Sequence, residues 1–181
     1  MYFQTQDLSV GYSGKTLIRN INISVEKGKI LTLIGPNGSG KSTILKTITK
    51  HLEKIAGVVT LDSRNVSKLS NKELAKKLSV MLTERIDPEL MTCGQVVAMG
   101  RYPYTNHFGL LTSQDREIVM ESLNMVHGQE LENRPFSDIS DGQRQRIMLA
   151  RAICQQPEII VLDEPTSYLD IRHKIELLDI L

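Results

Sequence analysis

Apolar residues gather in short runs along this chain, and the runs are of two kinds. Nearly unbroken apolar runs cover residues 30–34, 78–82 and 159–162. Runs of four or five apolar residues are typical of strands that are buried on both faces of a sheet. An antiparallel flap is predicted from the β-rich stretches at residues 3–10, 20–25 and 57–61.

The spacing of apolar residues becomes helical between Thr92 and about Gln155. Shorter helices are predicted at residues 41–45, 71–77 and 170–181. We therefore expect an α/β fold in which a helical subdomain is inserted between two strands of one sheet. Residues 1–84 and 156–181 would form the core with its β flap, and residues 85–155 the α-helical subdomain.

The composition excludes several classes of protein. The 181 residues are 40% hydrophobic, which is enough for a core, and the net charge of +1 gives no electrostatic field for a nucleic-acid partner. The apolar runs are too short to cross a bilayer and no signal peptide precedes them, so the chain is expected to be soluble and cytosolic. Cys93 and Cys154 match no metal-ligand spacing and are expected to be small buried side chains.

A glycine-rich bend precedes the first predicted helix. Gly35, Gly38 and Gly40 lack a Cβ, so the backbone can curl and point several N–H groups at one spot, next to the positive end of the helix dipole. Lys41 would reach the β- and γ-phosphates of a nucleotide, and the Ser42 hydroxyl would ligate Mg²⁺. The alternative is a plain glycine-rich turn whose serine caps the helix. The predicted phosphate site consists of Asn37, Gly38, Ser39, Gly40, Lys41, Ser42 and Thr43.

Two acids follow the apolar run at residues 159–162. Ligands of open α/β sheets collect at the ends of the strands, where Asp163 would hold Mg²⁺ and Glu164 would polarise the water that attacks the γ-phosphate. The alternative is a pair of acids that are merely solvated.

Two segments of the chain resemble ABC ATPases. Residues 139–145, Ile-Ser-Asp-Gly-Gln-Arg-Gln, are similar to the signature sequence of that family, and residues 163–170 resemble its Walker B strand end and D-loop. Taken alone, the Ser140 segment would be an ordinary helix N-cap. The resemblance implies a P-loop NTPase core that binds ATP and Mg²⁺ and hydrolyses ATP, with Lys41 and Glu164 in the catalytic set.

The resemblance also implies a dimer. In this family Ser140, Gly142 and Gln143 would close over the ATP that the phosphate loop of a second copy holds, in a head-to-tail, isologous dimer. Tyr12 occupies the position at which the family stacks an aromatic ring on adenine, although an aromatic residue there could simply pack.

The sequence departs from the family pattern at two points. Thr83 stands where the family usually has a glutamine that senses Mg²⁺, so either Thr83 or Glu84 would contact the metal or its water. The switch histidine and its strand are missing, because the sequence stops at Leu181 and His173 is no substitute. We therefore expect a longer natural protein, the C-terminal remainder of the domain being absent here, and a chain that binds nucleotide better than it turns it over.

Residues 99–104 (Met-Gly-Arg-Tyr-Pro-Tyr), with Gly109 and residues 115–117, resemble the helical subdomain of ATPases that drive iron–siderophore, haem and cobalamin importers. This resemblance implies an integral-membrane permease dimer as partner, an extracytoplasmic substrate-binding protein as indirect partner, and a position on the inner face of the cell membrane. The alternatives are an exporter ATPase, a soluble ABC protein that clamps in translation or chromosome repair, and a regulatory subunit without turnover.

Overall fold

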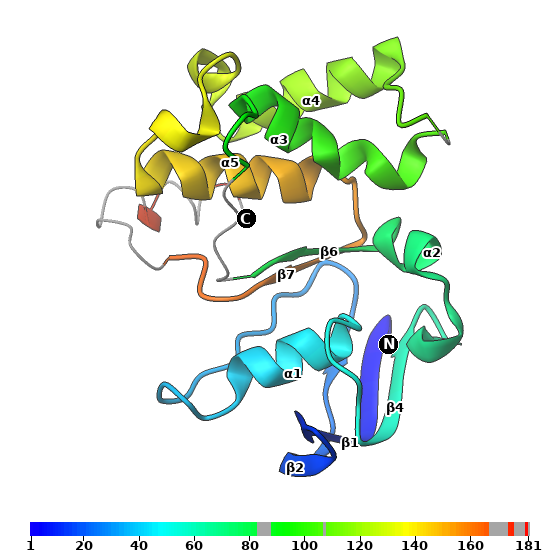
Figure 1. The fold of residues 1–181 in the computed structure, drawn as a ribbon. Coiled ribbons are helices and arrows are strands. Elements are labelled where there is room, and N and C mark those ends of the chain that lie inside the picture. The colour runs from blue at the N-terminus through cyan, green and yellow to red at the C-terminus, as the bar shows by residue number, and fades with distance from the viewer. Residues whose placement is uncertain (83–87, 107, 167–173, 176–179, 181) are drawn as a thin grey trace. The chain divides into compact units, whose positions relative to one another are not determined.

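The computed structural model describes the chain except for residues 83–87, 107, 167–173, 176–179 and 181 (Figure 1). The chain forms two compact units, Met1–Leu74 and Ala75–Leu181. The division into a core of residues 1–84 and 156–181 and a helical subdomain of residues 85–155 stays a prediction. Thr83, Glu84, His173 and most of the helix expected at residues 170–181 lie outside the described residues.

The first unit contains an antiparallel sheet with β1 (Phe3–Tyr12) at its centre. β1 pairs with β2 (Lys15–Ile21), β3 (Ser24–Val25) and β4 (Ala56–Leu61), and β4 pairs with the short strand β5 (Arg64–Asn65). The turn between β1 and β2 consists of Ser13 and Gly14, both with positive φ, as tight two-residue hairpins require. The expected antiparallel flap is confirmed.

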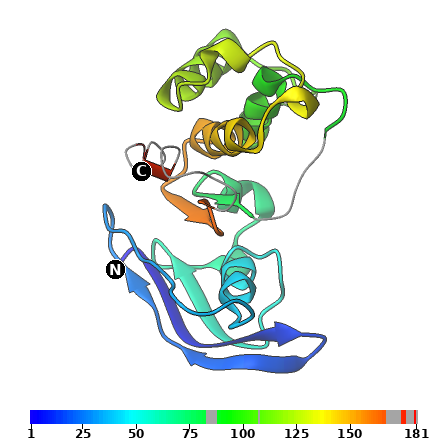
Figure 2. The ribbon, with the colours of Figure 1, turned by 90° about the vertical axis from the view of Figure 1, so that its left-hand side faces the viewer.

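One helix of the first unit, α1 (Lys41–Ile48), lies between β3 and β4 in the sequence. Figure 2 shows α1 beside the sheet, where it contacts β1. A 3₁₀ turn, η1 (Val66–Lys68), and the short helix α2 (Asn71–Ala75) follow β5. Both α-helices begin where the sequence predicts them, although α2 ends two residues earlier than expected.

Residues 30–34 do not form the buried strand that their apolar character predicts. They have no regular secondary structure, and the side chains of Ile30 and Ile34 are 83% and 92% exposed. A strand needs neighbours that accept and donate its backbone hydrogen bonds as well as apolar side chains. Within the described residues, the parallel pairing that this run was expected to join involves β6 and β7 alone.

The second unit places two parallel strands beneath a layer of helices (Figure 1). β6 (Leu78–Met81) and β7 (Ile159–Leu162) pair in register from Leu78 with Ile159 to Met81 with Leu162. Parallel neighbours need a long crossover, and here the crossover contains the helices. Both strands were predicted from their apolar runs and are confirmed.

The crossover consists of α3 (Cys93–Ala98), η2 (Met99–Tyr104), α4 (Ser113–Met125), η3 (Gln129–Leu131), η4 (Phe136–Asp138) and α5 (Asp141–Cys154). The helices share one core, in which Val96, Leu123, Phe136 and Ile147 are 0% exposed. Cys93 and Cys154 are unpaired and buried in it, as expected. The predicted helical region is thus confirmed, and none of the described helices is long and apolar enough to cross a membrane.

Candidate functional site

The glycine-rich bend leads into a helix whose first turn is left open. Gly40 is the N-cap of α1 and adopts the left-handed conformation (φ 91°), and it has no side chain that could accept a hydrogen bond from the first-turn N–H groups. This left-handed conformation favours glycine, and a Cβ there would also lie 2.6 Å from Ile18 Cδ1, so that this side chain would have to move. In contrast, α3, α4 and α5 all begin with complete capping boxes. The N-cap of α1 therefore offers no side-chain oxygen that would compete with an anion for the first-turn N–H groups.

Lys41 lies over the same bend. Its ammonium donates hydrogen bonds to the carbonyl oxygens of Gly35 (2.8 Å) and Pro36 (2.9 Å). These neutral acceptors hold the charge at the bend, and a phosphate would accept stronger, charge-assisted bonds from it. The open first turn and the nearby ammonium fit a nucleotide phosphate.

Tyr12 comes from the end of β1 and lies against α1. Its hydroxyl is 3.2 Å from Thr43 Oγ1, and about half of the side chain remains exposed. Thr43 is buried, and Ser42 precedes it in the first turn of α1. The structure therefore brings together the tyrosine and the phosphate-loop residues expected to bind nucleotide, and stacking on adenine stays a prediction.

The acids after β7 have unlike surroundings. Asp163 is 4% exposed, and its backbone N–H donates to Met81 O (2.9 Å), which continues the pairing with β6. Glu164 is exposed and has a positive φ of 50°, which is uncommon for a residue with a long side chain. The backbone thus turns sharply between a buried carboxyl and an exposed one.

The segment that resembles the signature sequence forms the start of α5. Ser140 Oγ accepts from the Gln143 backbone N–H (3.2 Å), and Gln143 Oε1 accepts from the Ser140 N–H (3.0 Å). The ordinary N-cap is therefore present, and it is compatible with the family role because the serine hydroxyl keeps its own hydrogen to donate. Gly142 lies in the same first turn.

A contact that the sequence analysis did not predict joins the signature helix to the acidic turn. Gln145 in α5 donates a hydrogen bond from Nε2 to the carbonyl oxygen of Pro165 (2.8 Å), the residue after Glu164. Nothing in the sequence pattern marks Gln145 for this contact, because the two residues are twenty positions apart and lie on different elements.

The described residues contain no group of three or more His, Cys, Asp or Glu side chains that could hold a metal ion. Mg²⁺ in nucleotide sites needs no such group, because it is typically held by one or two protein oxygens together with phosphates and water. Ser42 and Asp163 offer oxygen ligands of this type, and Thr83 lies outside the described part of the chain.

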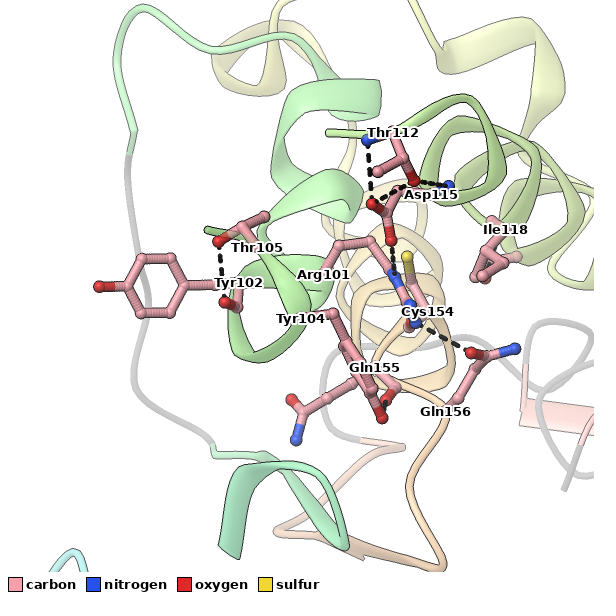
Figure 3. Close-up of polar contacts among 11 residues, drawn as sticks. Arg101, Tyr102, Tyr104, Thr105, Thr112, Asp115, Ile118, Cys154, Gln155 and Gln156 are labelled. Carbon is pink, nitrogen blue, oxygen red and sulfur yellow. Dashed lines mark hydrogen bonds and ion pairs between the residues drawn. The ribbon is translucent and has the colours of Figure 1, made fainter. Parts of the chain in front are cut away.

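A buried ion pair links the two segments that resemble importer ATPases (Figure 3). Arg101 Nε lies 2.9 Å from Asp115 Oδ1, and both side chains are less than a tenth exposed. The Thr112 hydroxyl donates to Asp115 Oδ2 (2.7 Å). The hydrogen bonds from Thr112, and next those from Arg101, hold the pKa of Asp115 below its ordinary value against the opposing effect of burial. Burial also raises the pKa of the Cys154 thiol to about 11, so this cysteine stays protonated at neutral pH.

Replacing Asp115 by asparagine should destabilise the second unit in a pH-dependent way. Because its folded-state pKa is lowered, the ionised Asp115 contributes stability above the ordinary carboxyl pKa of 3.8 and loses it as the pH falls through the lowered value. The free energy of unfolding of the variant should be lower by about 3 kcal/mol at neutral pH, because the Arg101 guanidinium is left without its anion.

Urea unfolding measured from neutral pH down to about pH 3 tests this, with the exposed substitution Glu117→Gln in the same helix as the control. The difference in the free energy of unfolding between the wild type and Asp115→Asn should become smaller as the pH falls. A difference of constant size would contradict an ionised Asp115.

Comparisons with known proteins agree on one family. The family model described as ABC transporter matches residues 18–167. The chain is 49% identical over 174 residues to an uncharacterised ABC transporter ATP-binding protein of Methanocaldococcus jannaschii, and 41% identical over 177 residues to the iron(3+)-hydroxamate import ATP-binding protein of Bacillus subtilis. The alignments cover 96% and 98% of this chain but 60% and 66% of those proteins, so the chain spans less than two thirds of their length.

The fold is also similar to that of a solved ATP-binding cassette. The dimeric post-hydrolysis structure of MJ0796 bound to ADP and Pi matches with a TM-score of 0.83 and 25% identity, over 98% of this chain and 80% of that one. The expected α/β class with a P-loop NTPase core is therefore confirmed.

Proposed function

Because this chain belongs to the ABC transporter family, we propose that it is the ATP-binding and ATP-hydrolysing subunit of an importer for an iron chelate, haem or cobalamin. The observation that carries the proposal is the first turn of α1, which has no side-chain cap and holds the Lys41 ammonium beside it. The name of the Bacillus subtilis relative, an iron(3+)-hydroxamate import protein, supports the iron-chelate class.

Different residues of the chain would bind the parts of ATP, hold Mg²⁺ and activate the attacking water. Lys41 and the N–H groups at the start of α1 would bind the β- and γ-phosphates, and Tyr12 would stack on the adenine. Glu164, exposed at the turn after β7, would orient the attacking water and polarise it. Ser42 and Asp163 would hold Mg²⁺, which supplies charge neutralisation at the phosphate oxygens when bound.

A second copy of the chain would complete each site. Ser140 is exposed and Gly142 and Gln143 are partly exposed at the start of α5, where a helix N-terminus and a serine hydroxyl can bind a γ-phosphate presented by another molecule. The MJ0796 cassette, described as a dimer bound to ADP and Pi, supports this assembly. Loss of the γ-phosphate on hydrolysis would release the interface and drive a conformational change in the partner.

That partner would be a permease dimer in the cytoplasmic membrane, loaded from outside by a substrate-binding protein, so the chain would lie on the inner face of the membrane. The test uses the full-length protein of which this chain forms part. ATP-dependent phosphate release, co-purification with a multi-span permease, and loss of iron-hydroxamate uptake on gene deletion would support the proposal. Association with polysomes and unchanged uptake would overturn it in favour of a soluble clamping protein.

Replacing Ser140 by arginine should block ATP-dependent dimerisation and leave nucleotide binding by the monomer intact. The larger, charged side chain would fill the space that the γ-phosphate of the second copy must enter. Sedimentation with and without ATP measures the dimer, and a fluorescent nucleotide measures binding. Ser113→Arg, at the exposed start of α4, is the control, and a normal ATP-dependent dimer of Ser140→Arg would rule out this interface.

A further inference from the structure

Three helical segments of the second unit, η2, α4 and α5, lie close together at the end of α5 (Figure 3). We define the Arg101 cluster as Arg101, Tyr104, Asp115 and the segment Cys154–Gln156. Arg101 Nη1 donates to Cys154 O (2.8 Å) and to Gln156 Oε1 (3.0 Å), and its Nε pairs with Asp115 at the start of α4. The guanidinium of Arg101, a residue that is 4% exposed, therefore links η2, α4 and the end of α5.

Tyr104 adds contacts at the same junction. Its hydroxyl donates to Gln155 O (3.1 Å), and two cations lie over its ring, the Arg101 guanidinium carbon at 4.0 Å and the Lys76 ammonium at 5.3 Å from the ring centroid. Cations over an aromatic face are attracted by its quadrupole. In Figure 3 the neighbouring Tyr102 points away from the cluster, so η2 presents one tyrosine inward and one outward.

The cluster also fastens the helices to the strand pair. Gln155 Nε2 donates to the carbonyl oxygens of Ala75 and Leu78, the second of which begins β6. The backbone N–H groups of Glu158 and Ile159 both donate to Lys77 O (2.8 and 3.0 Å). The helical layer and the first residues of both strands are thus joined at the end of α5.

The start of α5 contacts the acidic turn after β7. Gln145 Nε2 donates a hydrogen bond to Pro165 O (2.8 Å). The start of α5 carries Ser140, and the far end of β7 carries Asp163 and Glu164. Both groups of ATP-facing residues therefore lie at the ends of elements that are joined firmly at the Arg101 cluster.

We propose that the Arg101 cluster is the pivot of the helical layer, and that Arg101 is a positioning residue that fixes the direction of α5 and hence the place of Ser140 in the ATP-bound dimer. This inference rests on the proposed function. α5 has 14 residues and is about 21 Å long, so a rotation of about 3° at its end moves its start by about 1 Å. A misplacement of about 1 Å is enough to lower the efficiency of a positioned site by up to about a hundredfold.

The test measures ATP-dependent dimerisation in the full-length protein carrying Glu164→Gln, with Arg101→Lys and Tyr104→Phe added separately. Lysine keeps the charge opposite Asp115 but cannot reproduce the fork of the guanidinium. Arg101→Lys should weaken the dimer by about tenfold or more. Tyr104→Phe keeps the stacked ring, loses only the bond to Gln155 O, and should weaken the dimer by about threefold. Nucleotide affinity of the monomer should not change in either variant.

The matched control is Arg116→Gln, which removes a cation from an exposed position next to Asp115. All measurements are made well below the unfolding temperature of each variant, so that a purely structural role would leave the dimer constant of the folded protein unchanged. If Arg101→Lys and Tyr104→Phe both dimerise as tightly as Arg116→Gln, the pivot is overturned.

A second measurement separates the pivot from the proposed function. Nitroxide labels at Ser137→Cys, before α5, and Glu158→Cys, before β7, report the angle between the two elements in the monomer without ATP, because the native Cys93 and Cys154 are 0% exposed. The distance distribution should broaden in Arg101→Lys and stay narrow in Arg116→Gln. If the parent protein fails to dimerise with ATP, the dimer of the proposed function is overturned. The distance distribution in the monomer still tests the pivot. If the distributions of Arg101→Lys and Arg116→Gln are equally wide, the pivot is overturned.

Discussion

The variant Lys41→Ala is expected to bind ATP about ten- to a hundredfold more weakly than the wild type. A charge-assisted hydrogen bond to a phosphate contributes about 1.5–3 kcal/mol, and Lys41 is the cation that the structure holds at the glycine-rich bend through the carbonyls of Gly35 and Pro36. Removal of the ammonium leaves the N–H groups at the start of α1 as anion donors, but without the neighbouring charge. Titration calorimetry of the full-length protein with ATP and Mg²⁺ measures the loss.

Lys46→Ala provides the matched control, because Lys46 belongs to the last turn of the same helix and lies away from the bend. Its effect on affinity should stay within about twofold, the size expected from a long-range change of one unit of charge. The helical signal in circular dichroism should be the same for both variants. An affinity of Lys41→Ala equal to that of Lys46→Ala would remove the lysine from the nucleotide site.

The helix starts that the sequence predicts correctly are those that depend on local preferences. The start of α1 is marked by glycines because the backbone before it needs a left-handed residue, and Gly40 adopts φ 91°. The N-cap considered at Ser140 is present as a capping box, and the structure shows two more capping boxes, at Thr92 and Thr112, which the sequence analysis did not predict. Such positions can be read from a few neighbouring residues.

The apolar run at residues 30–34 shows that a local pattern is not enough to predict a strand. An apolar run indicates that burial of the segment would stabilise the fold, but it does not indicate which strand will accept the backbone hydrogen bonds of the segment. The runs that became β6 and β7 pair with each other and have the helical layer over them. The run at 30–34 forms no ladder in the described structure and stays exposed.

The candidate site divides in the same way. Lys41, Ser42, Asp163, Glu164 and Ser140 could be singled out as candidates because each belongs to a compact sequence pattern with a known chemical purpose, and their roles stay predictions. The residues that position them could not: Arg101 contacts Cys154 and Gln156, more than fifty positions away, and Gln145 contacts Pro165. Long-range pairs of this type leave no periodic signal in one sequence.

The variant Glu164→Gln is expected to bind ATP normally and to lose at least about a hundredfold in the rate of hydrolysis, the usual contribution of a general base. Glutamine has nearly the same size and shape as glutamate, so the turn with its positive φ at residue 164 and the buried Asp163 before it should be preserved. What is lost is the carboxylate that polarises the attacking water. Phosphate release by the full-length protein, measured at saturating ATP, gives the rate.

Because the variant still binds ATP, its dimer should persist instead of dissociating after each turnover. Sedimentation should show a stable dimer with ATP and a monomer with ADP, since ADP lacks the γ-phosphate on which both signature turns would close. Glu158→Gln removes a carboxylate from the opposite end of β7, where it forms a partly exposed ion pair with Lys77, and should retain the wild-type rate. Wild-type turnover in Glu164→Gln would mean that another group activates the water, and the assignment of the acid pair after β7 would then have to be abandoned.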